Sequence, residues 1–296
     1  MKIIPEQERE GLVKMFRDFS PMPHSPERPI LSAQLEKLWY KKTFPPFRAV
    51  LFDVYGTLLL PQTGRQISPV VDRAAGELVK ELNSLGYPGG IEDFSQDIDG
   101  IIDKTNSETK PLYAYPEVDI EAIILGRFPV LSQTQDQARK IAVLLECVRN
   151  PCSPMPGAKK LLEALVAAGI PLGYVSNAQF YTPLLLEGLF SEPLGSRGVL
   201  EKLCFFSYEF GFSKPEPKFF EKASRSLGAM GIAAGETLVL GNSAENDTAP
   251  AKKQGFLTAL VARDRHTFYP PRESWGEEEL PDMVITDLEV FAREIY

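Results

Sequence analysis

The sequence predicts an α/β fold, a doubly wound parallel sheet with a helical cap domain inserted into it. Two observations lead to this prediction. Short apolar runs alternate with amphipathic helical segments over residues 154–296, which is typical of a parallel sheet covered by helices. Residues 61–153 instead carry helical periodicity without strand alternation, which indicates one small helical bundle.

The predicted elements follow the chain from residue 48 onward. A first strand at 49–52 leads into the insert, whose helices are expected at about 70–85, 91–107, 119–128 and 134–149. A proline-rich linker at 150–157 returns the chain to the sheet. The expected elements beyond it are a helix at 158–168, a strand ending at 176, a helix at 181–189, a strand at 204–207, a helix at 216–227, a strand near 238, a helix at 249–254, a strand at 258–261 and an edge strand at 284–286 before a terminal helix. The predicted domains are therefore a core of 48–60 with 154–296 and a cap of 61–153.

Residues 1–47 form an N-terminal extension outside this pattern. An amphipathic helix is expected at 5–19, followed by a proline-rich stretch and a short helix at about 33–40. We expect the extension to pack on the body through Phe16, Leu38 and Trp39. Contact with a partner or with the substrate is the alternative.

Composition narrows the class of protein. With 296 residues and 44% hydrophobic residues the chain can bury two cores, and its net charge of −8 argues against nucleic acid or an anionic membrane as the main partner. No apolar run approaches the roughly 18 residues of a membrane span. Three cysteines without metal-ligand spacing fit a reducing, cytoplasmic environment rather than a disulfide framework. Nothing in the sequence indicates an oligomeric state.

Four short motifs lie at predicted strand ends or helix starts. Aspartate at the carboxyl end of a buried parallel strand occupies the place where open α/β sheets bind ligands. The motifs are Asp53-Val54-Tyr55-Gly56-Thr57, Ser176-Asn177, Lys214-Pro215 and Gly241-Asn242-Ser243-Ala244-Glu245-Asn246-Asp247.

In this order the motifs resemble those of the haloacid dehalogenase-like hydrolases, and the resemblance extends from about residue 48 to the C-terminus. It implies a Rossmann-like core, a helical cap over the site, and a nucleophilic Asp53 that forms a covalent aspartyl intermediate with a small anionic substrate. Lys214 would balance charge and Asp247 would act as the base. The residues that the resemblance places in the catalytic site are Asp53, Tyr55, Thr57, Ser176, Asn177, Lys214 and Asp247.

Two departures from the phosphatases of this family limit the prediction. Those enzymes have a second aspartate where this chain has Tyr55. General acid–base catalysis by that aspartate typically raises the rate by about 10²–10⁴-fold. A phenol with a pKa of about 10 cannot easily replace it at neutral pH. Asn242 stands where a charged Mg²⁺ ligand is expected, so a site made by Asp53, the Tyr55 carbonyl oxygen, Asn242 and Asp247 should bind Mg²⁺ weakly.

The Asp-x-Tyr-Gly-Thr pattern instead resembles the metal-independent 2-haloacid dehalogenases, in which no cofactor is needed. Ala244 falls where those enzymes have an asparagine, and Glu245-Asn246-Asp247 is similar to the phosphatase pattern. We therefore favour dehalogenase chemistry slightly over a Mg²⁺-dependent phosphatase. A catalytically silent scaffold that acts through protein contacts is the third alternative.

Several cap residues could meet an anionic substrate through charge or hydrogen bonding. They are Arg65, Lys110, Tyr113, Tyr115 and Arg127.

Overall fold

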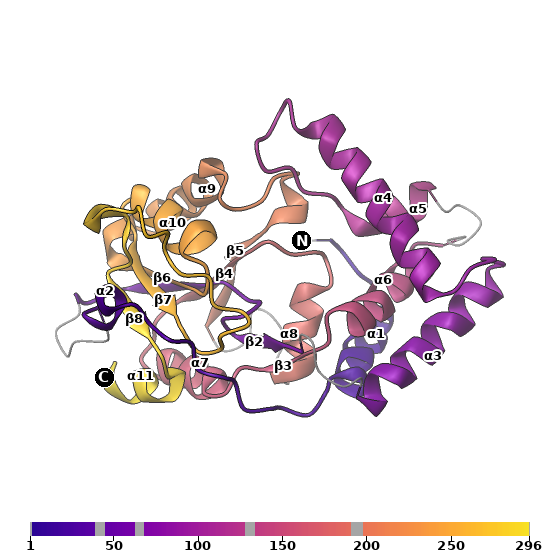
Figure 1. The fold of residues 1–296 in the computed structure, drawn as a ribbon, viewed down its shortest axis with the longest axis horizontal. Helices are drawn as coiled ribbons and strands as arrows, with labels where there is room; N and C mark the ends of the chain where they lie inside the picture. The colour runs from indigo at the N-terminus through magenta and orange to yellow at the C-terminus, as the bar shows by residue number, and fades with distance from the viewer. Residues whose placement is uncertain (1, 39–44, 63–67, 128–133, 191–197, 296) are drawn as a thin grey trace.

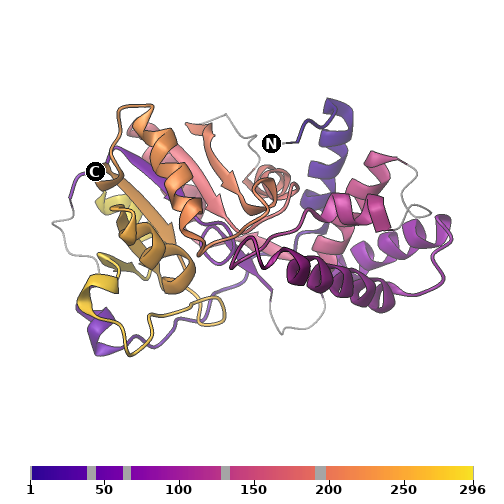
Figure 2. The same ribbon diagram turned by 90° about the horizontal axis from the view of Figure 1, so that it is seen from above.

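The computed structural model describes residues 2–38, 45–62, 68–127, 134–190 and 198–295, arranged as an α/β lobe beside a helical lobe (Figures 1 and 2). The α/β lobe contains a six-stranded sheet in the order β5-β4-β1-β6-β7-β8, and every neighbouring pair is parallel. The strands are β1 (Ala49–Phe52), β4 (Leu172–Ser176), β5 (Val199–Phe206), β6 (Thr237–Gly241), β7 (Leu257–Val261) and β8 (Met283–Ile285). The predicted doubly wound parallel sheet with a helical insert is confirmed.

Helices cover both faces of the sheet, and β1 shows why its sequence is apolar throughout. Val50 and Phe52 point into the core cluster shared with α7 (Ala158–Ala167) and α11 (Leu288–Glu294). Ala49 and Leu51 point into the opposite cluster, shared with α9 (Pro217–Gly228) and α10 (Ala249–Lys253). Because side chains alternate along a strand and both faces are buried, all four residues must be apolar.

The helical lobe is the insert between β2 (Leu59–Pro61) and β3 (Cys152–Pro154). Its helices are α3 (Pro69–Ser84), α4 (Ile91–Thr109), α5 (Ile120–Arg127) and α6 (Gln135–Arg149), each within two residues of the predicted bounds. The antiparallel pairing of β2 with β3 was not predicted, because strands of three residues are too short to show a period. This ribbon brings the two ends of the insert together at the sheet lobe.

The N-terminal extension contacts both lobes. Helix α1 (Glu6–Phe19) buries Leu12, Val13 and Phe16 against α8 (Thr182–Phe190) and lies beside α6 (Figure 1). Gly188 allows this approach, since a Cβ there would lie 3.0 Å from both Phe16 Cβ and the Val13 carbonyl oxygen. The short α2 (Ala33–Glu36) packs beside β8.

Packing on the body is therefore what the structure shows for Phe16 and for Leu38, whose carbonyl accepts a hydrogen bond from Val284. The predicted second helix is shorter than expected, ending at Glu36, and Trp39 lies outside the described residues.

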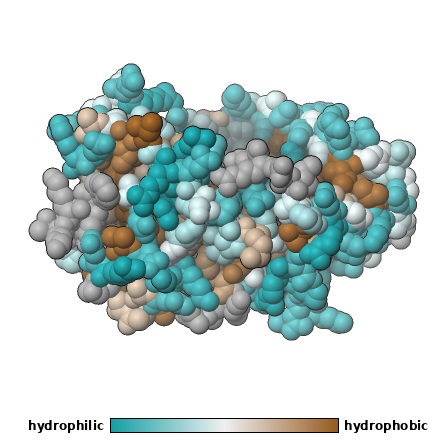
Figure 3. Space-filling view, turned by 60° about the horizontal axis from the view of Figure 1, so that its bottom comes forward, coloured by the Kyte–Doolittle hydropathy of each residue, from teal (hydrophilic) through white to brown (hydrophobic). Residues whose placement is uncertain are grey.

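Short 3₁₀ and π turns complete the described chain. They are η1 (Ser207–Glu209), η2 (Ala234–Glu236), η3 (Ala244–Thr248) and η4 (Glu277–Glu279). The face drawn in Figure 3 is dominated by hydrophilic residues with small scattered apolar patches. Among the residues described, no helix combines the length and apolarity needed to span a bilayer. The three cysteines are buried free thiols, in line with the absence of a predicted disulfide framework.

Candidate active site

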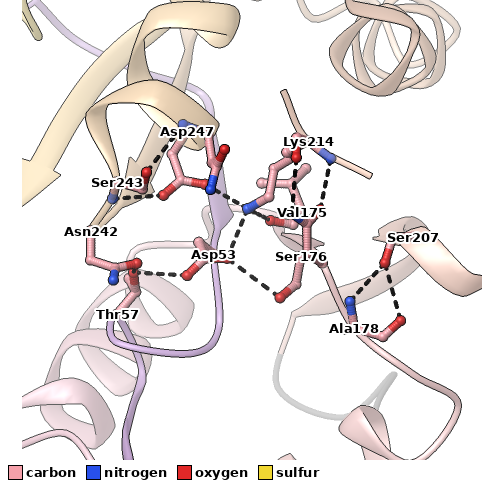
Figure 4. Close-up of polar contacts among 12 residues, drawn as sticks. Asp53, Thr57, Val175, Ser176, Ala178, Ser207, Lys214, Asn242, Ser243 and Asp247 are labelled. Atoms are coloured by element: carbon pink, nitrogen blue, oxygen red, sulfur yellow. Dashed lines mark hydrogen bonds and ion pairs between the residues drawn. The ribbon is translucent and has the colours of Figure 1, made fainter. Parts of the chain in front are cut away.

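The predicted motifs meet at the carboxyl ends of three neighbouring strands (Figure 4). Asp53 directly follows β1, Ser176 ends β4, and Asn242 directly follows β6. Because β4 and β6 are the two parallel neighbours of β1, their ends lie at one edge of the sheet. Side chains far apart in the sequence are thereby brought within hydrogen-bonding distance.

Asp53 is nearly buried, with 6% of its surface exposed. Its backbone N–H donates to the Leu240 carbonyl at 2.8 Å, which fixes the turn after β1. Its Oδ1 accepts hydrogen bonds from Lys214 Nζ at 2.8 Å and Ser176 Oγ at 3.4 Å, and its Oδ2 accepts one from Thr57 Oγ1 at 3.2 Å. These donors orient the carboxylate.

Lys214 lies between two carboxylates and is buried with them. Its ammonium group donates to Asp53 Oδ1, to Asp247 Oδ1 at 2.5 Å and to the Val175 carbonyl at 2.7 Å. All three donors of the ammonium are therefore used. Burial lowers the pKa of Lys214, but the Asp247 and Asp53 carboxylates raise it more, so the net pKa lies above the ordinary value.

Asp247, in η3, completes this charged triad. Its Oδ2 accepts the backbone N–H of Ser243 at 2.9 Å. Burial raises the pKa of Asp247 to about 6, although Lys214 acts in the opposite direction. Gly241 makes room for it, since a Cβ there would lie 2.3 Å from the Asp247 carboxyl group. A carboxyl group with this pKa can exchange protons near neutral pH.

Asn242 is fitted to its surroundings as an amide. Its Oδ1 accepts a hydrogen bond from Thr57 Oγ1 at 3.3 Å, and its Nδ2 donates to the Thr267 carbonyl. An aspartate here would place a carboxylate oxygen against that carbonyl. Only glycine fits at position 56 beside this amide. Its φ is +84°, and a Cβ there would lie 2.3 Å from Asn242 Nδ2.

Asn177 holds the lysine loop in place. Its Oδ1 accepts the Lys214 N–H at 2.7 Å and its Nδ2 donates to the Lys214 carbonyl at 3.0 Å. The side chain thus positions Lys214. The expected contact with substrate stays a prediction.

The hydroxyl group of Tyr55 points toward the N-terminal end of α8. Its Oη lies 3.1 Å from Thr182 Oγ1. Burial, and then the charge of Glu146 on α6, raise the pKa of Tyr55 well above its usual value. Glu146 itself accepts hydrogen bonds from Tyr181 Oη and Asn150 Nδ2, both at 2.9 Å.

Sequence reasoning missed Glu146, Thr182 and Thr267, which belong to no motif. For Glu146 a signal was available, since it lies four residues after Ala142 on the buried side of the predicted helix at 134–149. An acidic residue on an apolar helix face is uncommon without a function or a partner. Thr182 and Thr267 carried no comparable signal.

The donor set fits Mg²⁺ poorly. Asp53 Oδ2 and Asn242 Oδ1 face the same Thr57 hydroxyl, but the Asp247 carboxyl oxygens are taken by Lys214 and the Ser243 N–H. Across the described ranges, no three acidic, histidine or cysteine side chains gather as a metal-binding group. Mg²⁺ prefers charged oxygen ligands, and one ionised carboxylate beside a neutral amide is a weak set.

The cap residues predicted to meet substrate take different positions. Tyr113 packs on Phe212, with ring centroids 4.9 Å apart, whereas Lys110 and Tyr115 are exposed. Arg65 and the side chain of Arg127 lie outside the described part of the chain.

Together these features define an α/β protein with an aspartate, a lysine and a second aspartate at the carboxyl edge of a parallel sheet, and with a helical insert. Residues 47–255, more than half of the chain, match the family of haloacid dehalogenase-like hydrolases. The chain belongs to that family and is a hydrolase of the dehalogenase or phosphatase type.

Two individual proteins illustrate the likeness. The chain is 26% identical over 242 residues to a glyceraldehyde 3-phosphate phosphatase of Methanocaldococcus jannaschii, covering 82% of this chain and 94% of that protein. The crystal structure of a 2-haloacid dehalogenase from Pseudomonas syringae pv. tomato DC3000 has the same fold. Its TM-score is 0.53 at 20% identity, over 84% of this chain and 98% of that one. The family match and the likeness to the phosphatase favour an enzyme over a silent scaffold.

Replacing Lys214 tests the charged triad. Lys214→Met leaves Asp53 and Asp247 buried without their cation, so we expect the free energy of unfolding at pH 8 to fall by about 3–5 kcal/mol. The loss should shrink at pH 5, where protonation of a carboxyl group relieves the repulsion. Urea unfolding measures it. The exposed Lys253→Met is the control, expected within about 0.5 kcal/mol of the parent; equal losses in both variants would contradict the triad.

Proposed function

We propose that the protein hydrolyses a small anionic substrate through a covalent ester on Asp53, and that the bond broken is a carbon–halogen bond. The environment of Tyr55 carries this proposal. Tyr55 stands where the family resemblance expects the acid of the phosphatases, yet its hydroxyl contacts Thr182 and burial raises its pKa. A halide ion leaves without a proton, so such a site can support carbon–halogen cleavage.

The first step is a substitution. An oxygen of the Asp53 carboxylate forms a bond to the carbon that carries the halogen, and the halide departs with the bonding electron pair. Thr57 and Ser176 orient the attacking group by hydrogen bonds. As Asp53 loses its charge in the ester, Lys214 keeps Asp247 as a partner and is free to attract the carboxylate of the substrate.

The second step is hydrolysis of the ester. Water attacks the carbonyl carbon of the esterified Asp53, and Asp247 accepts one proton and passes it to the departing hydroxyl group. The other proton goes to solvent as Asp53 returns to the carboxylate. The overall change is one water consumed, with the hydroxy acid, halide and a proton released. No step passes through a metal.

The direct test is chloride release from L-2-chloropropionate, measured with Mg²⁺ and with EDTA. We expect equal rates in both, and a loss of at least about 10³-fold in Asp53→Asn because the nucleophile is gone. Asp72→Asn, an exposed aspartate of α3, is the matched control and should keep full activity. Release that stops in EDTA, or that survives in Asp53→Asn, would count against the proposal.

The role of Asp247 predicts a pH profile. Since the pKa of its carboxyl group is raised to about 6, chloride release should fall as the pH drops through about 6 and level off above it. A protonated Asp247 cannot accept a proton from water. Asp247→Asn should lower the rate by about 10²–10⁴ and abolish this acidic limb. An acidic limb that persists in the variant would assign the titration to another group.

Hydrolysis of a phosphate monoester is the second candidate. It is supported by the likeness to the glyceraldehyde 3-phosphate phosphatase over 94% of that protein. Asp53 would then attack phosphorus, and the leaving group would have to be a good one because Tyr55 offers no proton at neutral pH. The neutral Asn242 would weaken any Mg²⁺ that assists.

Tyr55→Asp separates the candidates. If the site is otherwise that of a phosphatase, the new carboxyl group should raise Mg²⁺-dependent turnover of an aryl phosphate by about 10²-fold or more. Tyr55→Phe removes the same hydroxyl without adding an acid and should give no gain. A folded Tyr55→Asp protein with no gain would leave the phosphatase candidate without support.

A further inference from the structure

A cavity of about 420 Å³ lies between the helical insert and the segment that follows Ser176. One wall is apolar and comes from α4, α5 and α6, with Ile98, Ile102 and Leu145 among its residues. Gln179 and Tyr181 of the α/β lobe form part of the opposite wall. The volume is in the range of small-molecule sites, and its Gln179–Tyr181 wall begins three residues after Ser176.

The charged groups in its described lining are mainly acidic. They include Asp99, Glu117, Glu146 and one cation, Arg149. Arg149 is paired with Asp99, with Nη1 2.8 Å from Oδ1 and Nη2 2.9 Å from Oδ2. The arginine is thus paired with Asp99, although its charge also lowers the pKa of Glu146. The described lining still holds three acidic side chains and one cation, so its net charge is negative.

Both glutamates are hydrogen-bonded by neutral groups. Glu146 accepts from Tyr181 Oη and Asn150 Nδ2. Glu117 accepts from Ser207 Oγ at 2.7 Å, from Gln179 Nε2 at 3.2 Å and from the Val118 N–H at 2.9 Å. These bonds fix the position of each carboxyl group but leave its charge without a contacting cation in the described structure.

Burial raises the pKa of Glu117 and of Glu146. A positive charge that enters the cavity would stabilise their ionised forms, and a second negative charge would be repelled. A neutral alcohol would gain hydrogen bonds without this charge interaction.

We propose that this cavity binds an organic ammonium group on a short apolar chain, and that the group is the remote end of the substrate whose halogen-bearing, anionic end lies at Asp53. The apolar wall receives the chain, and Glu146 and Glu117 receive the ammonium. The assignment to the substrate rests on the proposed function, whereas the binding site does not.

Binding is tested without turnover in Asp53→Asn by NMR titration with n-butylammonium, n-butanol and butyrate. We expect the ammonium to perturb the amides of 142–150 and 179–181 and to bind at least about tenfold more tightly than the alcohol, with butyrate weakest. Glu146→Gln and Glu117→Gln, each added to Asp53→Asn, should each abolish this preference. Glu108→Gln, at an exposed acid of α4, should keep it. Three outcomes would overturn the proposed binding site. They are equal binding of the alcohol and the ammonium, a preference for the ammonium that is unchanged in both cavity variants, and no binding of any probe.

Inhibition of the active protein identifies the source of the ammonium. Competitive inhibition by n-butylammonium against L-2-chloropropionate supports the remote end of the substrate. Binding with non-competitive or no inhibition would overturn that assignment and make the cavity a site for a separate cation. Because the titration uses an inactive variant, failure of the proposed chemistry and failure of the site are distinguishable.

Discussion

The buried contact of Lys214 with Asp53 and Asp247 is the interaction on which the site depends. Two carboxylates cannot both stay ionised in a buried site without a cation between them. Lys214 supplies that cation at 2.8 and 2.5 Å. Asn177 fixes the backbone of Lys214, and the Val175 carbonyl accepts the third hydrogen bond of the ammonium group. The triad therefore couples the end of β4, the turn after β1 and η3 into one unit.

In the proposed mechanism this arrangement also divides the chemistry between the two aspartates. Asp53 receives three hydrogen bonds from side chains, which orient its carboxylate for the proposed nucleophilic attack. Asp247 is more deeply buried, and burial raises its pKa to about 6, as suits a proton acceptor near neutral pH. The same lysine contacts both carboxylates, and burial outweighs its charge in setting the raised pKa of Asp247.

Much of the fold and of the charged triad could be predicted from the sequence, because the signals are local. Apolar runs that stop at Asp53 and Ser176 mark buried strands, and parallel strands bring their carboxyl ends together. The presence of Lys214 and Asp247 in the site was predicted from the order of the motifs. The contacts of Tyr55 with Thr182 and of Asn242 with Thr267 could not be predicted, because they join positions 127 and 25 residues apart that share no pattern. The β2–β3 ribbon was missed since three residues show no period.

Tyr55 and Asn242, read from the sequence as departures from the phosphatase pattern, are each fitted to specific partners. The Thr267 carbonyl needs a donor, which Asn242 supplies and aspartate would not. The Tyr55 hydroxyl has Thr182 as its partner and stands close enough to Glu146 for the two charges to interact. If the site had only lost its phosphatase residues, Thr182 and the Thr267 carbonyl would not be expected to have matching hydrogen-bond partners. Their mutual fit supports the proposal that the tyrosine and the amide belong to the functional site, and that the leaving group of its reaction needs no proton from residue 55.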